Sequence, residues 1–571
     1  MKVDERPVTE LARATSRKRR LKLFLIASAI VLIAWVAVAS IDAYRVARAV
    51  RAGRAEFKKI AALDSSGKMH ADALAGMRDF ESARRIASHS IALGAWARVP
   101  LLGRPAAWLR KAADATATLS HEASDAIGRI EPALHTTDRT ALLRLLDTEF
   151  TNLAAGVARI HLPSTGGFFP PVNAANHQLT QDLARLRTSL ADGIAGVRGL
   201  DSMLEGPTTY LVLAANNAEM RAGGMVLQAG LLTSARGHIA AGYFTPTAGL
   251  QLTKPVASPA QIRALYGWLS PGTEWRNVGS SPNFPVTAPI YAAMAKARGK
   301  HNVDGVLQID VIGMRALLQV VGPVGRYNAG NVEQLLLHDQ YARFGAQQVE
   351  RRLAFSQLAE ATFKALNDRP WDVTRLARAL RDAARGRHLM AWSRRPVEQA
   401  AWQRLQMDGA LDPDGVMLTV QNQTGNKLDW FVKPQMALSV EQLAGGWRRV
   451  HLRISIANPT PLGEPAYIAG DGTLVPSGTD RALVAVYLPG WATNVEMPGR
   501  TVAIVGPDGP MRVIGGRVDI ARGSAVEVDV TFSAPPGEQQ IVLLPSGRAR
   551  AVPLRDGSRW FSDETPNVIA L

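Results

Sequence analysis

The pattern of apolar and polar positions divides the chain into an N-terminal apolar segment and four larger parts. Residues 23–41 form one continuous apolar run, and residues 42–203 show helical patterns with charged faces. Short apolar strands alternate with helices across residues 204–330, and helical patterns return across residues 331–410. Residues 411–571 show the alternation of half-buried strands. The chain is therefore predicted to be a multidomain α+β protein.

The run LFLIASAIVLIAWVAVASI, residues 23–41, is predicted to cross a membrane as one helix. About 20 apolar residues span the hydrocarbon, and cytoplasmic Lys and Arg set the direction of insertion. The preceding tail, residues 1–22, ends in a basic cluster, so we expect a cytoplasmic N-terminus and an extracytoplasmic bulk. Six more basic residues follow within residues 45–59, so this orientation relies on the density of the first cluster. A signal peptide cleaved near residues 37–39 (Ala-Val-Ala) is the alternative.

Residues 42–203 are predicted to form a helical stalk next to the membrane. This stretch is rich in Ala, Leu and Arg, and prolines and the loop at residues 161–171 separate its periodic segments. The expected helices cover residues 71–93, 104–130, 138–160 and 174–204.

An α/β core is predicted across residues 204–330. Continuous apolar runs at 210–214, 225–234 and 306–309 are typical of buried strands, and residues 288–297 and 311–321 read as helices. Ligands of open α/β sheets lie at the carboxyl ends of the strands. The sequence therefore indicates a candidate ligand site, made of Asn216, Asn217, Glu219, Arg221, Gly223, Gly224, Asp304 and Asp310.

Each of these residues also has a structural interpretation. The two Asn and two Gly residues suit a turn, and Asp310 stands where a helix begins and could be its N-cap. Asp304, before Gly305, has the same turn chemistry, while Glu219 could pair with Arg221. Arg221 is the strongest ligand candidate, because a guanidinium beside glycine amides can grip a phosphate.

The C-terminal half is predicted to contain a helical segment and a β-sandwich. Three tryptophans of residues 331–404, at positions 371, 392 and 402, are interpreted as packing anchors. Residues 450–456 alternate apolar and polar side chains, as a half-buried strand requires. Similar runs, separated by Gly, Pro and Asp turns, predict strands at 482–488, 501–505, 526–532 and 540–544.

Composition bears on the partners of the protein. The 571 residues carry a net charge of +17, of which residues 1–22 hold +5. The remaining +12 would attract polyanions, and outside the cytoplasm these are lipid head groups or phosphate- or uronate-bearing envelope polymers, not nucleic acid. A merely solvated basic surface is the alternative. With no cysteine in the chain, disulfides, thiolate nucleophiles and cysteine metal sites are excluded.

Several common catalytic motifs are absent from the sequence. It contains no GxxxxGK[ST] phosphate loop, no GxGxxG opening a helix, no GxSxG elbow and no HExxH. ATP hydrolysis, dinucleotide redox chemistry, α/β-hydrolase acyl transfer and zinc proteolysis therefore lose support.

The segment YLVLAANNAEMRAGGMVLQAGLLTSARGHI, residues 210–239, resembles the signature of the domain of unknown function 4012 family, a bacterial envelope family of uncharacterised activity. Further segments of the family pattern occur in the expected order at residues 281–294, 303–324 and 387–393. One position departs from the family pattern Pro-Asp-Phe-Pro, because this chain has Asn283 in place of the Asp. An amide cannot supply the charge of a carboxylate, so a metal or base role at this position is doubtful.

The order of elements is also distantly similar to the LytR-CpsA-Psr phosphotransferases, which attach glycopolymers from pyrophosphate carriers to the cell wall. Two function classes follow. The first is a tethered envelope protein that binds or organises surface polymer or partner proteins. The alternative, which the second resemblance implies, is a phosphotransferase that uses Mg or Mn, with Arg221 on phosphate, Glu219 and Asp310 as metal or base candidates, and Asn216 orienting the substrate. We prefer the first, since it needs fewer residues to converge.

Overall fold

The computed structural model describes most of the chain beyond the N-terminal tail. The described residues are 34–60, 68–100, 103–134, 136, 138–167, 169–299, 302–345, 347–369 and 372–571. The described residues within 1–134 and 145–193 form one compact unit, and those within 135–144 and 194–571 form the other.

The predicted basic tail and most of the predicted membrane helix, residues 1–33, lie outside the described residues. Residues 34–60 are helical. Within the described ranges, no helix combines the length and the apolar character needed to cross a bilayer.

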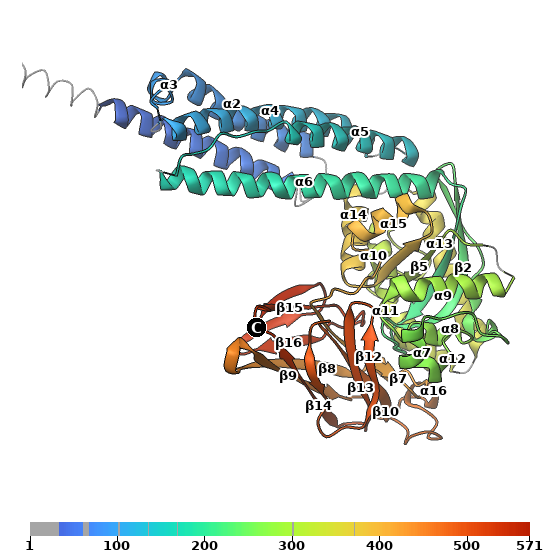
Figure 1. Cartoon of the computed structure of the whole chain (residues 1–571). Helices are drawn as coiled ribbons and strands as arrows, with labels where there is room; N and C mark the ends of the chain where they lie inside the picture. The colour runs from blue at the N-terminus through green and yellow to red at the C-terminus, as the bar shows by residue number, and fades with distance from the viewer. Residues whose placement is uncertain are drawn as a thin grey trace, which may run out of the picture. The chain divides into compact units, whose positions relative to one another are not determined.

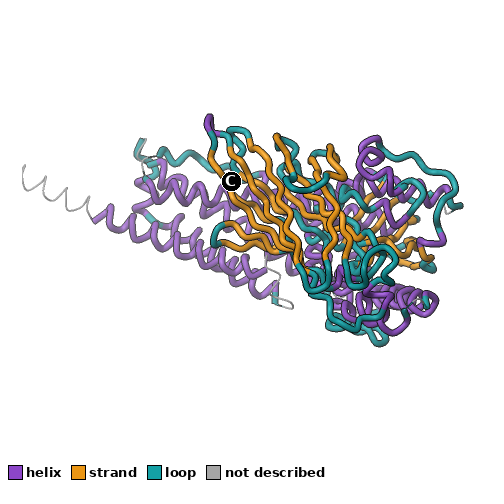
Figure 2. Tube along the Cα trace, turned by 90° about the horizontal axis from the view of Figure 1, so that it is seen from below, coloured by secondary structure: helices purple, strands orange, loops and turns teal. Residues whose placement is uncertain are grey.

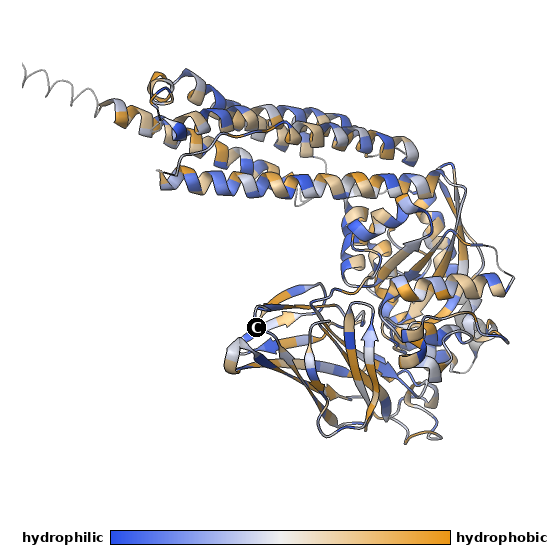
Figure 3. Ribbon diagram, viewed as in Figure 1, coloured by the Kyte–Doolittle hydropathy of each residue, from blue (hydrophilic) through white to orange (hydrophobic). Residues whose placement is uncertain are grey.

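The first unit is a bundle of helices. Small residues of α2 and α4 pack against the helix at residues 34–60. Val46 of that helix is buried together with Ala83 and Ala87 of α2 and Ala113 of α4. Further along, Val157 of α5 packs on Leu183 and Leu190 of α6. Figure 3 shows hydrophobic and hydrophilic residues alternating along these helices, as expected when one stripe of each is buried. The helices that lie wholly or mostly in this unit are α2 Met69–His89, α3 Ile91–Trp96, α4 Arg104–Ala133, α5 Arg139–Ala158 and α6 Pro170–Glu205. The predicted helical N-terminal region is confirmed.

A mixed sheet with strand order β3-β2-β1-β5-β6 forms the centre of the α/β core, and β4 (Thr245–Pro246) pairs with β2 (Figure 1). In this sheet β1 (Thr208–Asn216) runs parallel to β5 (Gly305–Ile309) and antiparallel to β2 (Met225–Ala235), which turns into β3 (His238–Ala241). The apolar run in β1 is continuous because both faces are covered. Tyr210 and Val212 pack on one side, and Leu211 and Leu213 pack on the other.

Helices cover the two faces of this sheet. Residues of α8 (Trp275–Val278) and α9 (Phe284–Ala297) share the core on the side of Leu211. On the side of Tyr210 the core contains residues of α10, α11, α12, α13, α14 and α15, which are Val311–Val321, Val332–Gln334, Gln340–Phe344, Gln348–Asp368, Val373–Arg385 and Pro396–Arg404. A π-helical turn, Leu335–Asp339, lies between α11 and α12.

One element differs from the prediction of helix across residues 331–404. Leu389–Ser393 forms strand β6, which pairs antiparallel with β5. Its five residues are too few for their periodicity to distinguish a strand from a buried helix. Trp402 is buried in the same core, as predicted for a packing anchor, whereas Trp371 lies outside the described residues.

The predicted C-terminal β-sheets are confirmed. Two six-stranded sheets, ordered β12-β13-β10-β7-β15-β18 and β11-β14-β9-β8-β16-β17, contribute to one apolar core (Figure 2, orange strands). In β9 the residues Val450, Leu452, Ile454 and Ile456 are buried, which matches the predicted alternation. The bounds are β7 Gly415–Asn422, β8 Lys433–Gln442, β9 Arg448–Ala457, β10 Asp480–Leu488, β11 Thr493–Glu496, β12 Val502–Asp508, β13 Met511–Ile520, β14 Ala525–Ala534, β15 Gln540–Leu543, β16 Pro553–Asp556, β17 Arg559–Ser562 and β18 Asn567–Ala570.

Candidate functional site

The candidate site centres on residues 217–224, here called the signature loop, which connects β1 to β2. Asn216, the last residue of β1, accepts a hydrogen bond from the amide of Ala218 at 2.8 Å. This is the turn geometry predicted for an Asn side chain. Its amide group also donates to the hydroxyl of Tyr341 at 2.8 Å. Asn216 is therefore held by the turn and by α12.

Asn217 and Asp310 meet at the carboxyl ends of β1 and β5. The Nδ2 of Asn217 donates to Oδ2 of Asp310 at 2.8 Å and to the carbonyl of Gly547 at 2.9 Å. Parallel neighbouring strands end at the same edge of a sheet, which explains this meeting.

Asp310 has two roles in this arrangement. Its Oδ1 accepts from the amide of Gly313 at 2.9 Å, so it is the N-cap of α10. Its Oδ2 lies 2.7 Å from Nδ1 of His388, which precedes β6. The N-cap interpretation and membership of a buried polar cluster therefore both hold.

Asp304 lies at the opposite end of β5 from Asp310. Its amide donates to the carbonyl of Thr209, and its Oδ2 accepts from the amide of Thr209, both at 2.8 Å. The Nε of Arg395 lies 3.6 Å from Oδ1 of Asp304. The structure therefore does not bring Asp304 together with the other candidate residues.

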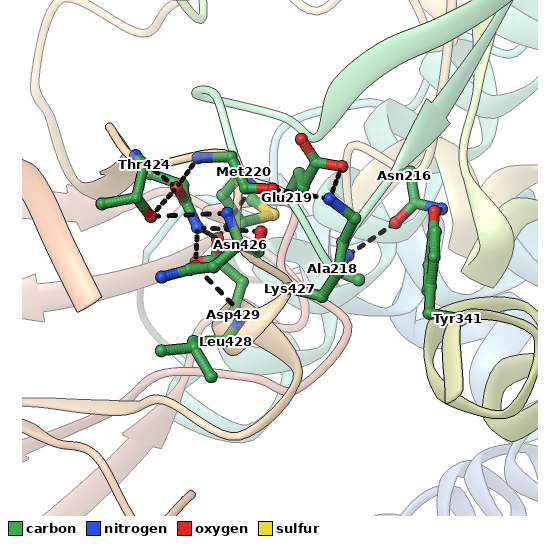
Figure 4. A network of polar contacts seen from close by, with 12 residues as sticks. Asn216, Ala218, Glu219, Met220, Tyr341, Thr424, Asn426, Lys427, Leu428 and Asp429 are labelled. Carbon is green, nitrogen blue, oxygen red and sulfur yellow. Dashed lines mark hydrogen bonds and ion pairs between the residues drawn. The ribbon is translucent and has the colours of Figure 1, made fainter. Parts of the chain in front are cut away.

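Glu219 pairs with Lys427, which follows β7 in the sandwich. The Lys427 ammonium also donates to the carbonyl of Gly425 at 2.7 Å and lies 4.9 Å from the ring centre of Tyr467 and 5.4 Å from that of Tyr341. Figure 4 shows this side chain beside Glu219 and Tyr341. Both charged side chains are almost fully buried: Lys427 is 4% exposed and Glu219 is 10% exposed. The partner expected for Glu219 from the sequence was Arg221, but its ion pair here is with Lys427.

Arg221 is buried, and its guanidinium contacts protein groups on several sides. Nε and Nη2 donate to Oδ1 of Asn277 at 3.1 and 2.8 Å. Nη1 donates to the carbonyl of Asn422 at 2.5 Å and to that of Met220 at 3.3 Å. Burial lowers the pKa of Arg221, while Glu219 and Asp429 act in the opposite direction. Arg221 thus joins the signature loop to α8 and to the end of β7.

A buried carboxylate, Asp429, anchors the loop to the sandwich. Its Oδ2 accepts from the amide of Met220 at 2.9 Å and from Nδ2 of Asn422 at 3.2 Å, and its Oδ1 accepts from Arg548 at 3.1 Å. Burial raises the pKa of Asp429, and Arg548 opposes the rise. Nearby Asp480 is fully buried, and neither carboxylate oxygen has a hydrogen-bond partner among the described residues. Burial and the neighbouring Asp429 raise the pKa of Asp480 to about 8.

The two candidate glycines serve backbone geometry. Gly224 has a φ of +86°, and an added Cβ would lie 3.3 Å from the carbonyl oxygen of Asn216. Because of this positive φ, a side chain at Gly224 would be strained. Gly223 contributes its backbone carbonyl, which accepts a hydrogen bond from Gln308 of β5 at 3.1 Å. In the described ranges, no group of three or more His, Cys, Asp or Glu side chains could hold a metal ion.

Four residues of this site were not predicted from the sequence. Lys427 and Asp429 contact the signature loop, His388 contacts Asp310, and Arg548 contacts Asp429. The run QNQTGNKLD at residues 421–429 offered a signal, because it places polar and charged residues directly after a continuously apolar strand. Its partners lie about 200 residues earlier in the chain, as for Met220 and Asp429, so the pattern alone could not pair them.

Asn283, where the chain departs from the family pattern, is buried at the start of α9. Its side chain lies near the carboxylate of Asp508, a residue whose pKa is raised by burial. A carboxylate at position 283 would face that buried acid, so the amide suits this environment.

Replacing Arg221 with Lys is expected to lower the free energy of unfolding by about 2–3 kcal/mol, because an ammonium cannot reproduce the planar set of bonds to Asn277 and Asn422. Urea denaturation of the full-length protein measures this change. Arg236→Lys, at the exposed turn between β2 and β3, is the matched control and should change stability by less than about 0.5 kcal/mol. Unchanged stability in Arg221→Lys would show that the internal bonds do not hold the loop.

Comparison with known families gives one match. Residues 205–341 match the family described as "Protein of unknown function (DUF4012)", which confirms the resemblance seen in the sequence. No curated protein and no solved structure matches the chain.

Proposed function

We propose that this chain is a membrane-tethered, extracytoplasmic envelope protein that binds or organises an anionic surface polymer or partner proteins. The observation that carries this proposal is the contact pattern of the signature loop. Glu219 pairs with Lys427, and Arg221 donates to Asn277 and Asn422. Glu219 and Arg221 are the charged side chains of the matched region that were the strongest ligand candidates. Their contacts instead join the α/β core to the sandwich.

The same contacts weigh against the alternative of a metal-dependent phosphotransferase. To grip a phosphate, Arg221 would have to exchange its bonds to Asn277 and Asn422 for the substrate. Glu219 would have to leave the buried ammonium of Lys427, and an unpaired buried charge is costly. A binding protein requires neither exchange, so these contacts favour it.

Net charge supports the choice of an anionic polymer as the ligand. The residues that follow the basic tail carry +12. Exposed positive charge raises the local concentration of a polyanion and speeds its association. The proposal therefore places the ligand on the exposed surface of the protein.

The tether is tested by topology. A reporter that is active only outside the cytoplasm, fused after Leu571, should be active and should stay with the membrane fraction, because residues 23–41 are long and apolar enough to span a bilayer. The same reporter fused before Met1 is the control and should be inactive. A soluble protein whose sequence starts near Ser40 would instead establish signal-peptide cleavage.

Binding is tested by its dependence on salt. The full-length protein in detergent micelles should bind an anionic polysaccharide at low ionic strength. The affinity should fall steeply as salt rises, since exposed charges are screened over about 10 Å at 0.1 M salt. A neutral polysaccharide of equal length is the control. Absence of binding at low salt would leave the basic surface as a solvated face and remove the polymer from the proposal.

A further inference from the structure

A groove in the α/β core, here called the arginine groove, lies between α10, residues 322–330 and α14. Its volume is about 590 Å³, within the range of about 300–1,000 Å³ that holds small ligands. Its polar lining consists of Gln319, Asn328, Arg375, Arg378 and Asp382. None of these residues belongs to the candidate site described above.

The basic character of the groove comes from α14. Four arginines at positions 375, 378, 381 and 385 recur every three or four residues, so they occupy one side of the helix, and of these Arg375 and Arg378 line the groove. The opposite side carries Leu376, Leu380 and Ala383, which pack in the core. Packing therefore fixes the helix with its arginine side outward, and Arg375 is exposed while Arg378 is half-buried.

Three other interactions involve the lining and the segments next to it. Asp372, the N-cap of α14, accepts from the amides of Thr374 and Arg375. Arg369 donates to the carbonyls of Val321 and Pro323 at 3.0 and 2.9 Å and so holds the segment after α10. Asp382, the acidic residue of the lining, accepts from Nε of Arg381 at 3.2 Å. The lining thus has more positive than negative charge on a supported backbone.

The mixture of groups points to an anionic sugar. Guanidinium groups bind carboxylates with two parallel hydrogen bonds. Gln319, Asn328 and Asp382 offer amide and carboxylate groups that can pair with sugar hydroxyls, and Pro323 and Ala379 add apolar wall. A uronate presents a carboxylate and hydroxyls on one ring, whereas a polyphosphate offers no hydroxyls for the amides.

We propose that the arginine groove binds uronate units of an anionic polysaccharide, with Arg375 and Arg378 holding a carboxylate. This inference rests on the proposed function and gives it a site and a ligand class. It also separates specific recognition from the attraction that the net charge exerts on any polyanion.

The test compares full-length variants in detergent micelles by calorimetric titration with a short oligogalacturonate. Arg375→Gln/Arg378→Gln should weaken binding by more than about tenfold, because two charge-assisted contacts are lost. Arg385→Gln/Arg555→Gln removes the same charge from exposed positions outside the groove. This matched control should lose less than about threefold in affinity, since only screened long-range attraction changes.

The outcomes separate this inference from the proposed function. If both double variants bind more weakly than the unaltered protein and to the same extent, the groove is overturned and the proposed function stands. The same holds if the unaltered protein binds and neither double variant is weakened. Failure of the unaltered protein to bind any anionic polymer would overturn the groove and also remove the polymer from the proposed function. Tighter groove-dependent binding of polyphosphate would overturn the uronate assignment. If the double variant loses its circular dichroism spectrum, Arg375→Gln alone, at an exposed position, decides the same question.

Discussion

Asp429→Asn is expected to destabilise the second unit by about 3–5 kcal/mol, because it removes one member of a buried ion pair. The side chains of Asp429 and Arg548 have exposures of 0% and 5%, so water cannot solvate the guanidinium that is left behind. The amide of Met220 and Nδ2 of Asn422 both donate to Oδ2 of Asp429, and the substitution turns this carboxylate into an amide. The loop between β1 and β2 should therefore loosen together with the end of the sandwich.

The measurement combines urea denaturation with hydrogen exchange of β1, β7 and β10, because exchange reports these strands separately from the helical bundle. Asp529→Asn is the matched control. Asp529 bonds to Arg453 at 3.2 Å but is 47% exposed, and exposed pairs contribute about 0–1 kcal/mol. Equal effects of the two substitutions would contradict the role assigned to Asp429.

Asp480→Asn is expected to remove a large part of the pH dependence of stability between about pH 4 and pH 8. The pKa of Asp480 is raised to about 8 by burial and by Asp429. Across this window the folded protein keeps a proton that the unfolded chain releases, so the free energy of unfolding falls as pH rises. A pKa difference of one between the folded and unfolded states corresponds to about 1.4 kcal/mol, so the total loss of stability across this window is at most about 6 kcal/mol.

Stability curves of the two proteins at pH 5 and pH 8.5 test this prediction. The substituted protein should be the more stable of the two at pH 8.5, and the difference should shrink at pH 5, where the carboxyl is neutral in the folded state. No hydrogen bond within the described residues is lost, since both oxygens of Asp480 lack a partner there. Asp529→Asn again serves as the control. Parallel pH curves would show that Asp480 is not held in its neutral form.

Part of the candidate site could be predicted from local pattern. The runs at 210–214 and 306–309 marked two buried strands, and the polar residues after them were expected at one edge of the sheet. The bond between Asn217 and Asp310 is this meeting. Asp304 was placed in the same group because it borders the same strand, but it precedes β5 whereas Asp310 follows it.

Local sequence was enough to specify the elements whose apolar period is long or bounded by strong signals: helices α4, α5 and α6, strands β1, β5 and β9, and the end of α10 at Gly322. The single helix predicted across residues 71–93 was wrong in one respect, because the helix breaks at Ser90 and α3 begins after it. Strand β6 has only five residues, so its form depends on pairing with β5. The partners of Glu219 and Arg221 depend on tertiary packing. Lys427 and Asn422 lie about 200 residues along the chain, and a buried charge is stabilised by whichever group the packing of two domains brings near it, a relation that no local pattern records.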